Sequence, residues 1–96
     1  MKRHDLKLRV PDEIAALIRG MHPHLKTKVK ASLKLIMSNP DEGKILRDEL
    51  SGLRSFRVGR SRIIYAVKKK MIEIVAIGPR ERTYEETYLI LKKGRK

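Results

Sequence analysis

The chain has 96 residues and a formal net charge of +13, with 24 Lys and Arg against 11 Asp and Glu, which fits one small basic domain spanning residues 1–96. The absence of cysteine excludes disulfides, thiolate metal sites and cysteine nucleophiles, and it fits a reducing cytoplasm. The basic N-terminus lacks the apolar run of a signal peptide, and no apolar stretch approaches the ~20 residues of a membrane span. We therefore expect a cytoplasmic protein.

The excess of positive charge indicates a polyanionic partner, because self-repulsion of this size destabilises a compact monomer. Nucleic acid is the first candidate, an acidic protein the second and an anionic membrane surface the third. A basic surface that serves only solubility is the alternative. The uneven placement of the cations along the chain favours a partner.

The first half of the chain predicts a short strand and two helices. Residues 6–10 alternate as a strand, with Leu6, Leu8 and Val10 on one face. Asp12 is expected to cap a helix, whose apolar residues repeat at helical spacing: Ile14, Leu17, Ile18 and Met21. A second helix is expected over residues 23–37, with an apolar stripe of Leu25, Val29, Leu33 and Ile36.

A lysine stripe, defined as Lys26, Lys30 and Lys34, follows one face of the second predicted helix. Like charges at this spacing cost about 0.2–0.5 kcal/mol per pair, and no acidic residue in the helix offsets them. The stripe is either a surface that faces a polyanion or a solvated face with mobile side chains. The sequence leaves both interpretations open.

The second half predicts three strands, over residues 53–59, 61–67 and 71–77, after a loop at residues 38–44. A terminal helix with Tyr84, Tyr88 and Leu91 on one side is expected to follow. The order β-α-α-β-β-β plus a C-terminal segment predicts an α+β domain. In this fold class, an antiparallel sheet has two N-terminal helices packed on one face.

Arginines crowd the first predicted hairpin, since the stretch from Arg54 to Val67 also holds Arg57, Arg60 and Arg62 and has no acidic residue. Strand alternation places Arg57 and Arg62 on the face away from Phe56 and Ile63, which the helices leave partly open. Arg80 follows the last strand at the same surface. Such guanidinium groups can bind phosphate and stabilise charge that develops during strand cleavage.

Other residues have weaker claims to chemistry. Tyr84 can transfer a proton if Arg80 and Arg82 favour its ionised form, or it can simply anchor the terminal segment. Glu81 is a minor candidate for a base, and Glu73 is expected to pair with a cation. His22 and His24 flank Pro23 without a nearby acid, so we expect no metal site and no cofactor.

The stretches "LSGLRSFRVGRSRIIYAV" and "IEIVAIGPRERTY" resemble the RelE/ParE toxin superfamily of toxin–antitoxin modules. The matching elements are a Gly-Leu turn, a strand with alternating basic residues, an Arg-Ile-Ile-Tyr strand, and a hydrophobic strand that ends in Gly, Arg and Tyr. These elements cover about residues 50–84. The resemblance implies a RelE-like fold and, in the RelE branch, mRNA cleavage on the ribosome by attack of a 2′-hydroxyl on the adjacent phosphate.

Residue by residue, the resemblance implies that Arg62 and Arg80 are catalytic arginines, that Arg57 replaces a strand lysine and that Tyr84 is the active-site tyrosine. A second strand basic residue falls at Gly59 or Arg60. Because Arg57 is not a lysine, the identity of the general base is open. RNA-binding residues are expected to be Arg54, Arg60 and the lysine stripe.

The same resemblance leaves two other functions open: a ParE-like poison of DNA gyrase, and a non-catalytic homologue that binds only its antitoxin or RNA. The set Arg57, Arg62, Arg80 and Tyr84 favours the ribonuclease. For either kind of toxin the implied protein partner is an acidic cognate antitoxin, in a toxin–antitoxin hetero-oligomer. The ribonuclease adds the ribosome and mRNA as partners, and no membrane is implied.

Overall fold

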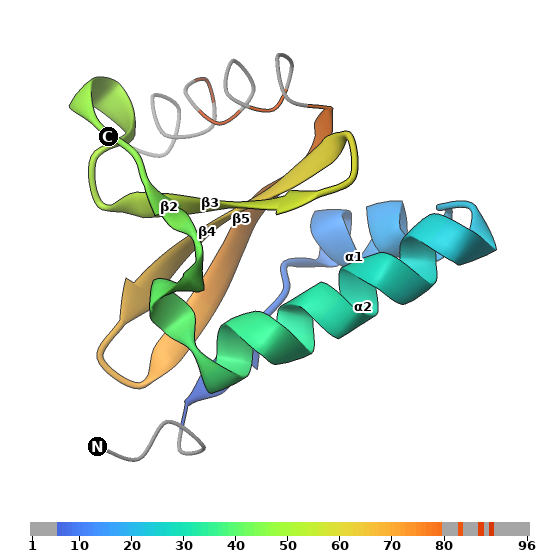
Figure 1. Ribbon diagram of the computed structural model, residues 1–96, viewed down its shortest axis with the longest axis horizontal. Helices are drawn as coiled ribbons and strands as arrows, with labels where there is room; N and C mark the ends of the chain where they lie inside the picture. The colour runs from blue at the N-terminus through green and yellow to red at the C-terminus, as the bar shows by residue number, and fades with distance from the viewer. Residues whose placement is uncertain (1–5, 80–82, 84–86, 88, 90–96) are drawn as a thin grey trace.

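The computed structural model describes residues 6–79, 83, 87 and 89. Figure 1 shows two helices lying along one side of a twisted sheet. The elements in chain order are β1 (Lys7–Arg9), α1 (Asp12–Arg19), α2 (Pro23–Ser38), the 3₁₀ turn η2 (Pro40–Glu42), β2 (Lys44–Ile45), the 3₁₀ turn η3 (Asp48–Leu50), β3 (Leu53–Val58), β4 (Ser61–Lys68) and β5 (Met71–Pro79). The α+β class and the two helices on one face are as predicted.

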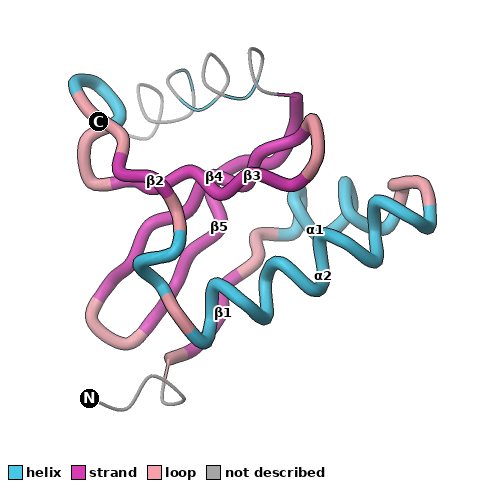
Figure 2. Tube along the Cα trace, in the orientation of Figure 1, coloured by secondary structure: helices cyan, strands magenta, loops and turns pink. Residues whose placement is uncertain are grey.

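The sheet has five strands in the order β1-β5-β4-β3-β2. Antiparallel pairing was expected and holds for the four strands from β2 to β5, whereas β1 pairs with β5 in parallel. The two helices between β1 and the rest of the sheet supply the long connection that parallel pairing needs (Figure 2). The two-residue edge strand β2 was not predicted: it begins at Lys44, the last residue of the predicted loop.

Neither helix begins with the usual Ser, Thr, Asp or Asn at its N-cap. Asp12 is the first residue of α1, and Pro11 precedes it without a side-chain cap, so the prediction that Asp12 caps the helix is wrong. Its carboxylate lies instead in the first turn, where it interacts favourably with the helix dipole. In α2 the cap is His22, whose Nδ1 accepts a hydrogen bond of 3.2 Å from the backbone N–H of His24.

The main core lies between the helices and the sheet. Its buried residues are Ile14, Ile18, Val29, Leu33, Ile36, Val58, Ile63, Tyr65, Ile72, Ile74 and Ile77, with Leu6, Leu8, Val10, Leu25 and Phe56 packed against them. The predicted apolar stripe of α2 is therefore confirmed. Leu17 was predicted to belong to the buried side of α1, but it is 48% exposed.

The opposite face of the sheet carries a second, smaller cluster. Leu53, Ile64 and Ala76 are buried there, with Leu46, Leu50, Ala66 and Val75 partly buried around them. Thr83 and Thr87 have helical backbone and are fully buried. This second face is thus only partly open, which agrees with the sequence-based expectation.

Two backbone features, a tight turn and a β-bulge, determine which side chains of the hairpins face the main core. Gly59 has a φ of 62° and is the first residue of the two-residue turn between Val58 and Ser61, a position that favours glycine in tight hairpins. In β5 the pairing skips Val75, because Ile64 pairs with Ala76 and Tyr65 pairs with Ile74. This bulge keeps Ile72, Ile74 and Ile77 in the main core.

No helix in the described part of the chain is long and apolar enough to cross a membrane.

Candidate nucleic-acid interface

Arg57 and Arg62 are direct cross-strand partners on β3 and β4. Both lie on the second face, since Phe56 and Val58 beside Arg57 and Ile63 beside Arg62 belong to the main core. Nε of Arg57 donates to the carbonyl oxygen of Gly59 at 3.3 Å, and Arg57 is exposed. The prediction that Arg57 and Arg62 share this face of the sheet is therefore confirmed.

Ser55 supports Arg62 from the neighbouring strand. Its Oγ accepts a hydrogen bond of 3.5 Å from Nη1 of Arg62, and its residue is 3% exposed. The guanidinium of Arg62 belongs to a residue that is itself only half-exposed. Contact with a buried neighbour limits the positions that this guanidinium can take. A side chain that binds and orients a phosphate needs such a restriction.

Lys44 adds a third cation to this face, and the sequence did not identify it. Lys44 pairs with Ser55 across β2 and β3, so it shares the face of Arg57 and Arg62. We call the row Lys44, Arg57 and Arg62 the cationic track. In the sequence, Lys44 is noticeable only as a lysine in a polar segment, two residues before a Leu-Arg pair. The pairing of β2 with β3 is needed to place it on this face.

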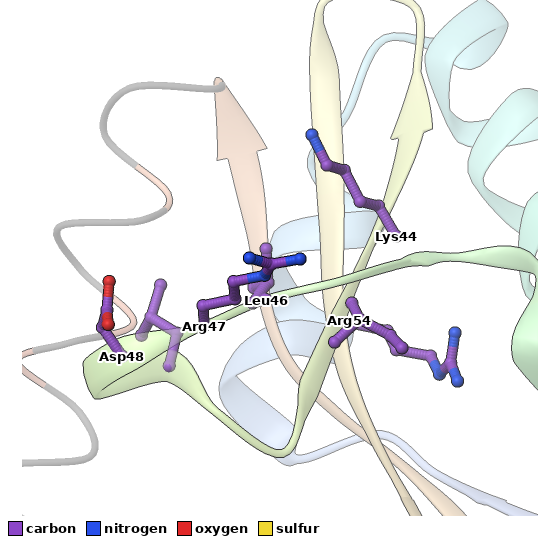
Figure 3. Close-up of a pocket in the computed structure, with 7 residues that line it drawn as sticks. Lys44, Leu46, Arg47, Asp48 and Arg54 are labelled. Atoms are coloured by element: carbon purple, nitrogen blue, oxygen red, sulfur yellow. The ribbon is translucent and has the colours of Figure 1, made fainter.

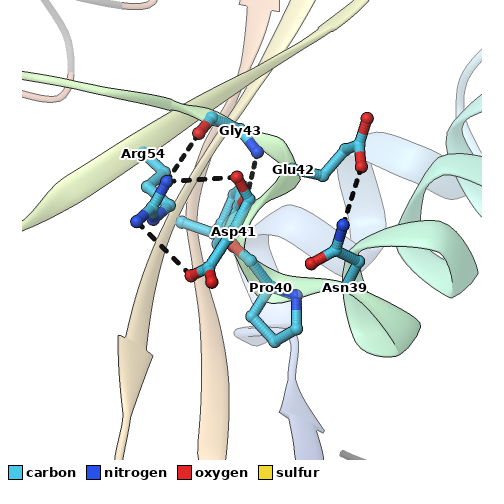
Figure 4. Close-up of polar contacts among 7 residues, drawn as sticks. Asn39, Pro40, Asp41, Glu42, Gly43 and Arg54 are labelled. Carbon is cyan, nitrogen blue, oxygen red and sulfur yellow. Dashed lines mark hydrogen bonds and ion pairs between the residues drawn. The ribbon is translucent and has the colours of Figure 1, made fainter.

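Arg54 lies on the other face of the sheet. Its Nη1 donates to the carbonyl oxygens of Gly43 at 2.8 Å and of Asp41 at 3.2 Å, and Nη2 is 3.4 Å from Oδ1 of Asp41 (Figure 4). The sequence grouped Arg54 with the RNA-binding residues because it shares their stretch of chain. In the structure its guanidinium holds the η2 turn, away from the cationic track.

Tyr65 fastens the same turn from inside the protein. Its hydroxyl donates to the carbonyl oxygen of Pro40 and accepts from the N–H of Gly43, both at 2.8 Å. Burial raises the pKa of Tyr65, although the hydrogen bond from Gly43 acts in the opposite direction. Gly43 has extended backbone and not a left-handed turn. A Cβ there would lie 2.5 Å from the Tyr65 hydroxyl oxygen, so close packing is what requires glycine.

The other predicted RNA-binding cations lie outside the track. Arg60 is exposed in the turn between β3 and β4, close to the track in the chain. The lysine stripe lies on α2, in the helical layer on the other side of the sheet; Lys30 and Lys34 are exposed and Lys26 is half-buried. The stripe therefore cannot reach the same phosphate as Arg62, and its role in RNA binding stays a prediction.

Arg80, Glu81 and Tyr84 lie outside the described residues, so their predicted roles stay predictions. The structure does describe where β5 delivers the chain: Gly78 pairs with Arg62 and Pro79 pairs with Ser61. The last described residues of β5 therefore lie beside the arginine pair.

Thr83 is a neighbour of the candidate site that the sequence analysis missed. A Cβ on Gly78 would lie 2.9 Å from Oγ1 of Thr83, so the threonine packs directly on the strand beside Arg62. Its hydroxyl donates to the carbonyl oxygen of Pro79 at 2.5 Å, and that of Thr87 donates to the carbonyl oxygen of Thr83 at 2.6 Å. The sequence signal for this contact was the spacing of Thr83 and Thr87, since residues four apart lie on one face of a helix.

Glu73 is an ion-pair partner, as predicted. Its carboxylate lies 3.0 Å from Nζ of Lys68 and 3.2 Å from Nε of Arg9. The hydrogen bond from Lys68 is the main reason that the pKa of Glu73 is lowered. Glu73 thus neutralises cations at the β1 edge, whereas no carboxylate among the described residues forms an ion pair with Lys44 or Arg57.

This geometry suits a phosphate backbone. Two guanidinium groups and one ammonium group lie on one face of the sheet, and guanidinium groups can bind two phosphate oxygens at once.

A comparison with protein families gives a family match: the family model described as the ParE toxin of the type II toxin–antitoxin system parDE matches residues 8–84. The chain belongs to this toxin family. Among curated proteins, no sequence match was found.

Solved structures of related toxins have the same fold as this family member. A double mutant of E. coli toxin RelE in the free state has a TM-score of 0.73 at 15% identity, covering 92% of this chain and 97% of that one. The complex RelBE2 from Mycobacterium tuberculosis gives 0.68 at 22%, covering 78% and 98%. The chromosomal ParDE system from P. aeruginosa gives 0.63 at 18%, covering 79% and 97%. The RelE/ParE superfamily resemblance is therefore confirmed.

Proposed function

We propose that this toxin is a ribosome-dependent endoribonuclease that cleaves mRNA and so inhibits translation. The observation that carries the proposal is the direct cross-strand pair of Arg57 and Arg62 on the second face of the sheet. Like charges directly opposite each other destabilise a sheet, so an anionic ligand gives this arrangement a physical reason. Single-stranded RNA, with one phosphate per nucleotide, can supply this anionic ligand.

The proposed reaction is attack of a ribose 2′-oxygen on the adjacent phosphorus. The 2′-hydroxyl loses its proton, the 2′-oxygen–phosphorus bond forms, the bond to the 5′-oxygen breaks, and that oxygen takes up a proton. The products are a 2′,3′-cyclic phosphate and a 5′-hydroxyl end. Negative charge grows on the phosphate oxygens in the transition state, and preorganised cationic donors stabilise that charge.

In this proposal Arg62 and Arg80 hold the scissile phosphate, and Arg57 positions the neighbouring backbone. Tyr84 orients or deprotonates the 2′-hydroxyl, or stacks on a base. Arginine stays protonated at any relevant pH, so Arg57 and Arg62 act by electrostatics and orientation. The ribosome supplies part of the substrate geometry.

The proposed protein partner is an acidic antitoxin. The net charge of +13 on this chain supports an acidic partner, because such a partner relieves self-repulsion and speeds association. Related toxins of this fold have been solved with antitoxins, including the archaeal RelE–RelB complex from Pyrococcus horikoshii. Co-purification of the chain with the product of an adjacent small reading frame tests the partnership.

A second candidate function is poisoning of DNA gyrase, favoured by the description of the matching family model as a ParE toxin. The two functions predict different cellular damage. The ribonuclease produces discrete cuts in translated messages, whereas the gyrase poison produces supercoiling defects with intact mRNA. Induced expression followed by mapping of mRNA ends and analysis of plasmid topology distinguishes them.

The proposed chemistry is tested on ribosome-bound mRNA with purified variants. Removing one preorganised donor of this kind costs about 10²–10³ in rate, so Arg62→Ala is expected to slow cleavage by that factor. Arg62→Lys should recover only part of the rate, because an ammonium cannot reproduce the guanidinium fork. Lys69→Ala, at the exposed tip of the β4–β5 hairpin, is the matched control. Cleavage by Arg62→Ala at the wild-type rate would contradict the proposed ribonuclease mechanism.

A further inference from the structure

The edge strand β2 and the residues after it offer two cations to solvent. Lys44 and Arg47 lie at the surface, and among the described residues neither forms an ion pair. They line an open groove of about 830 Å³ together with Leu46, Asp48, Leu50, Ile45 and Arg54. We propose that Lys44 and Arg47 form a second phosphate-binding site, which holds the RNA backbone beside the scissile phosphate. This inference rests on the proposed ribonuclease function.

The orientation of the side chains supports a continuous path for RNA. Figure 3 shows Lys44 and Arg47 directed to the same side of β2, while Arg54 points to the other side. Lys44 pairs with Ser55, so Arg57 is its diagonal neighbour at about 7–8 Å, within reach of long side chains. Arg57 in turn pairs directly with Arg62. The cations thus lead from Lys44 on β2 to Arg57 on β3 and then to Arg62 on β4.

The distances along this path leave room for neighbouring phosphates. Strands lie about 4.8 Å apart, so Lys44 on β2 and Arg62 on β4 are separated by about 10 Å across the sheet. At that separation each cation can hold a phosphate of its own. In this proposal Lys44 contacts the backbone next to the cleaved bond, where it contributes to RNA binding.

The site is built on a fixed part of the protein. The backbone N–H of Leu46 donates to the carbonyl oxygen of Leu53 at 3.0 Å, and Leu46 and Leu50 pack in the second cluster. On the other side, Tyr65 and Arg54 hold the turn that precedes β2. A site held from both sides keeps its cations in place before RNA arrives, which lowers the entropic cost of binding.

An RNA backbone fits this surface better than an acidic peptide. Leu46 and Leu50 line the groove but are only partly exposed, because they pack against the second cluster, and the exposed Ile45 pairs with Arg54, on the other face of β2. Lys44 and Arg47, the more exposed groups, are charged, whereas protein interfaces usually depend on an apolar anchor. Asp48 also lines the groove. Its carboxylate should repel phosphate, so we expect the RNA to contact Lys44 more strongly than Arg47.

The test measures the affinity of a short single-stranded RNA oligonucleotide at several salt concentrations, with Lys44→Gln, Arg47→Gln and the double variant. Each of the two cations is expected to contribute about two- to fivefold in affinity. Removing one phosphate-binding cation should lower the log–log salt slope by about 0.7. Lys69→Gln makes the same charge change at the far hairpin tip and should bind like wild type. Circular dichroism checks that each variant is folded.

The outcomes separate this inference from the proposed function. Support requires weaker RNA binding and a smaller salt slope for Lys44→Gln than for Lys69→Gln. The inference is overturned if Lys44→Gln binds like Lys69→Gln, if wild-type protein does not bind the RNA, or if the variant loses affinity only for an acidic protein partner. Cleavage by Arg62→Ala bears on the proposed function alone, because the RNA affinity is measured without cleavage.

Discussion

Arg57 and Arg62 face each other across the hydrogen-bonded strands β3 and β4, in a sheet that would be more stable without this pairing of like charges. We predict that Arg57→Gln raises the free energy of unfolding by about 0.2–1 kcal/mol while it lowers RNA cleavage. Urea unfolding at low and high salt checks the first part. The gain should shrink at high salt, since screening already weakens the repulsion in the wild type. An unchanged or lower stability at low salt contradicts the prediction.

The hydroxyl of Tyr65 should be important for stability, because it satisfies two backbone groups of the η2 turn. Tyr65→Phe leaves the buried N–H of Gly43 without this partner, and the expected loss is about 1–3 kcal/mol. Thermal and urea unfolding measure it. Asn39→Ala is the matched control: it removes the exposed hydrogen bond to Glu42 in the same turn, and it should cost much less.

Gly43→Ala is predicted to destabilise the protein for a steric reason. The new Cβ would lie 2.5 Å from the Tyr65 hydroxyl oxygen and 2.9 Å from its Cε1, so the ring or the turn must shift. Overpacking of this kind costs about 1–3 kcal/mol. Gly52→Ala at the exposed turn before β3 is a useful contrast, because its cost comes from a φ of 91° and not from contact. Combining Gly43→Ala with Tyr65→Phe should cost less than the sum of the two single changes, and strict additivity would exclude the steric cause.

Glu73 should make stability depend on pH in the acid range. Its pKa is lowered in the folded protein from an ordinary value of 4.5, chiefly by the hydrogen bond from Lys68. A depressed carboxyl pKa stabilises the fold above the unfolded value and loses that effect as the pH falls below about 4.5 through the folded pKa. Glu73→Gln should therefore flatten the acid side of the stability profile. Glu49→Gln removes an exposed carboxylate that forms no ion pair with the described residues, and it should leave the profile as in the wild type.

The lysine stripe on α2 is predicted to contribute to the affinity for ribosomes and not to chemistry. Replacing Lys26, Lys30 and Lys34 with Gln should weaken ribosome binding and reduce its salt dependence, by about 0.7–0.9 in log–log slope for each phosphate that the variant no longer binds. Helix stability should rise slightly, since like charges four residues apart are removed. An affinity and a salt slope that both match wild type would identify the stripe as a solvated face.

The sequence by itself determined the local parts of this protein. Helical spacing located the buried stripe of Val29, Leu33 and Ile36, and two-residue alternation placed Arg57 and Arg62 on the face away from the main core. These features depend on neighbours in the chain, whose periods of 3.6 and 2 residues are set by backbone geometry. The superfamily was recognised for the same reason, because its pattern lies within adjacent strands.

Only the tertiary structure decided which distant segments meet. The parallel pairing of β1 with β5 joins residues 7–9 to residues 71–73, and no local pattern encodes that choice of partner. Arg54 and Lys44 show the same limit: one was predicted in the RNA-binding surface and holds a turn, and the other was missed and lies on the cationic track. Both depend on the pairing of β2 with β3 and on the turn that Tyr65 holds. Long-range packing chooses these contacts, so the chemistry of a single residue in the sequence cannot reveal them.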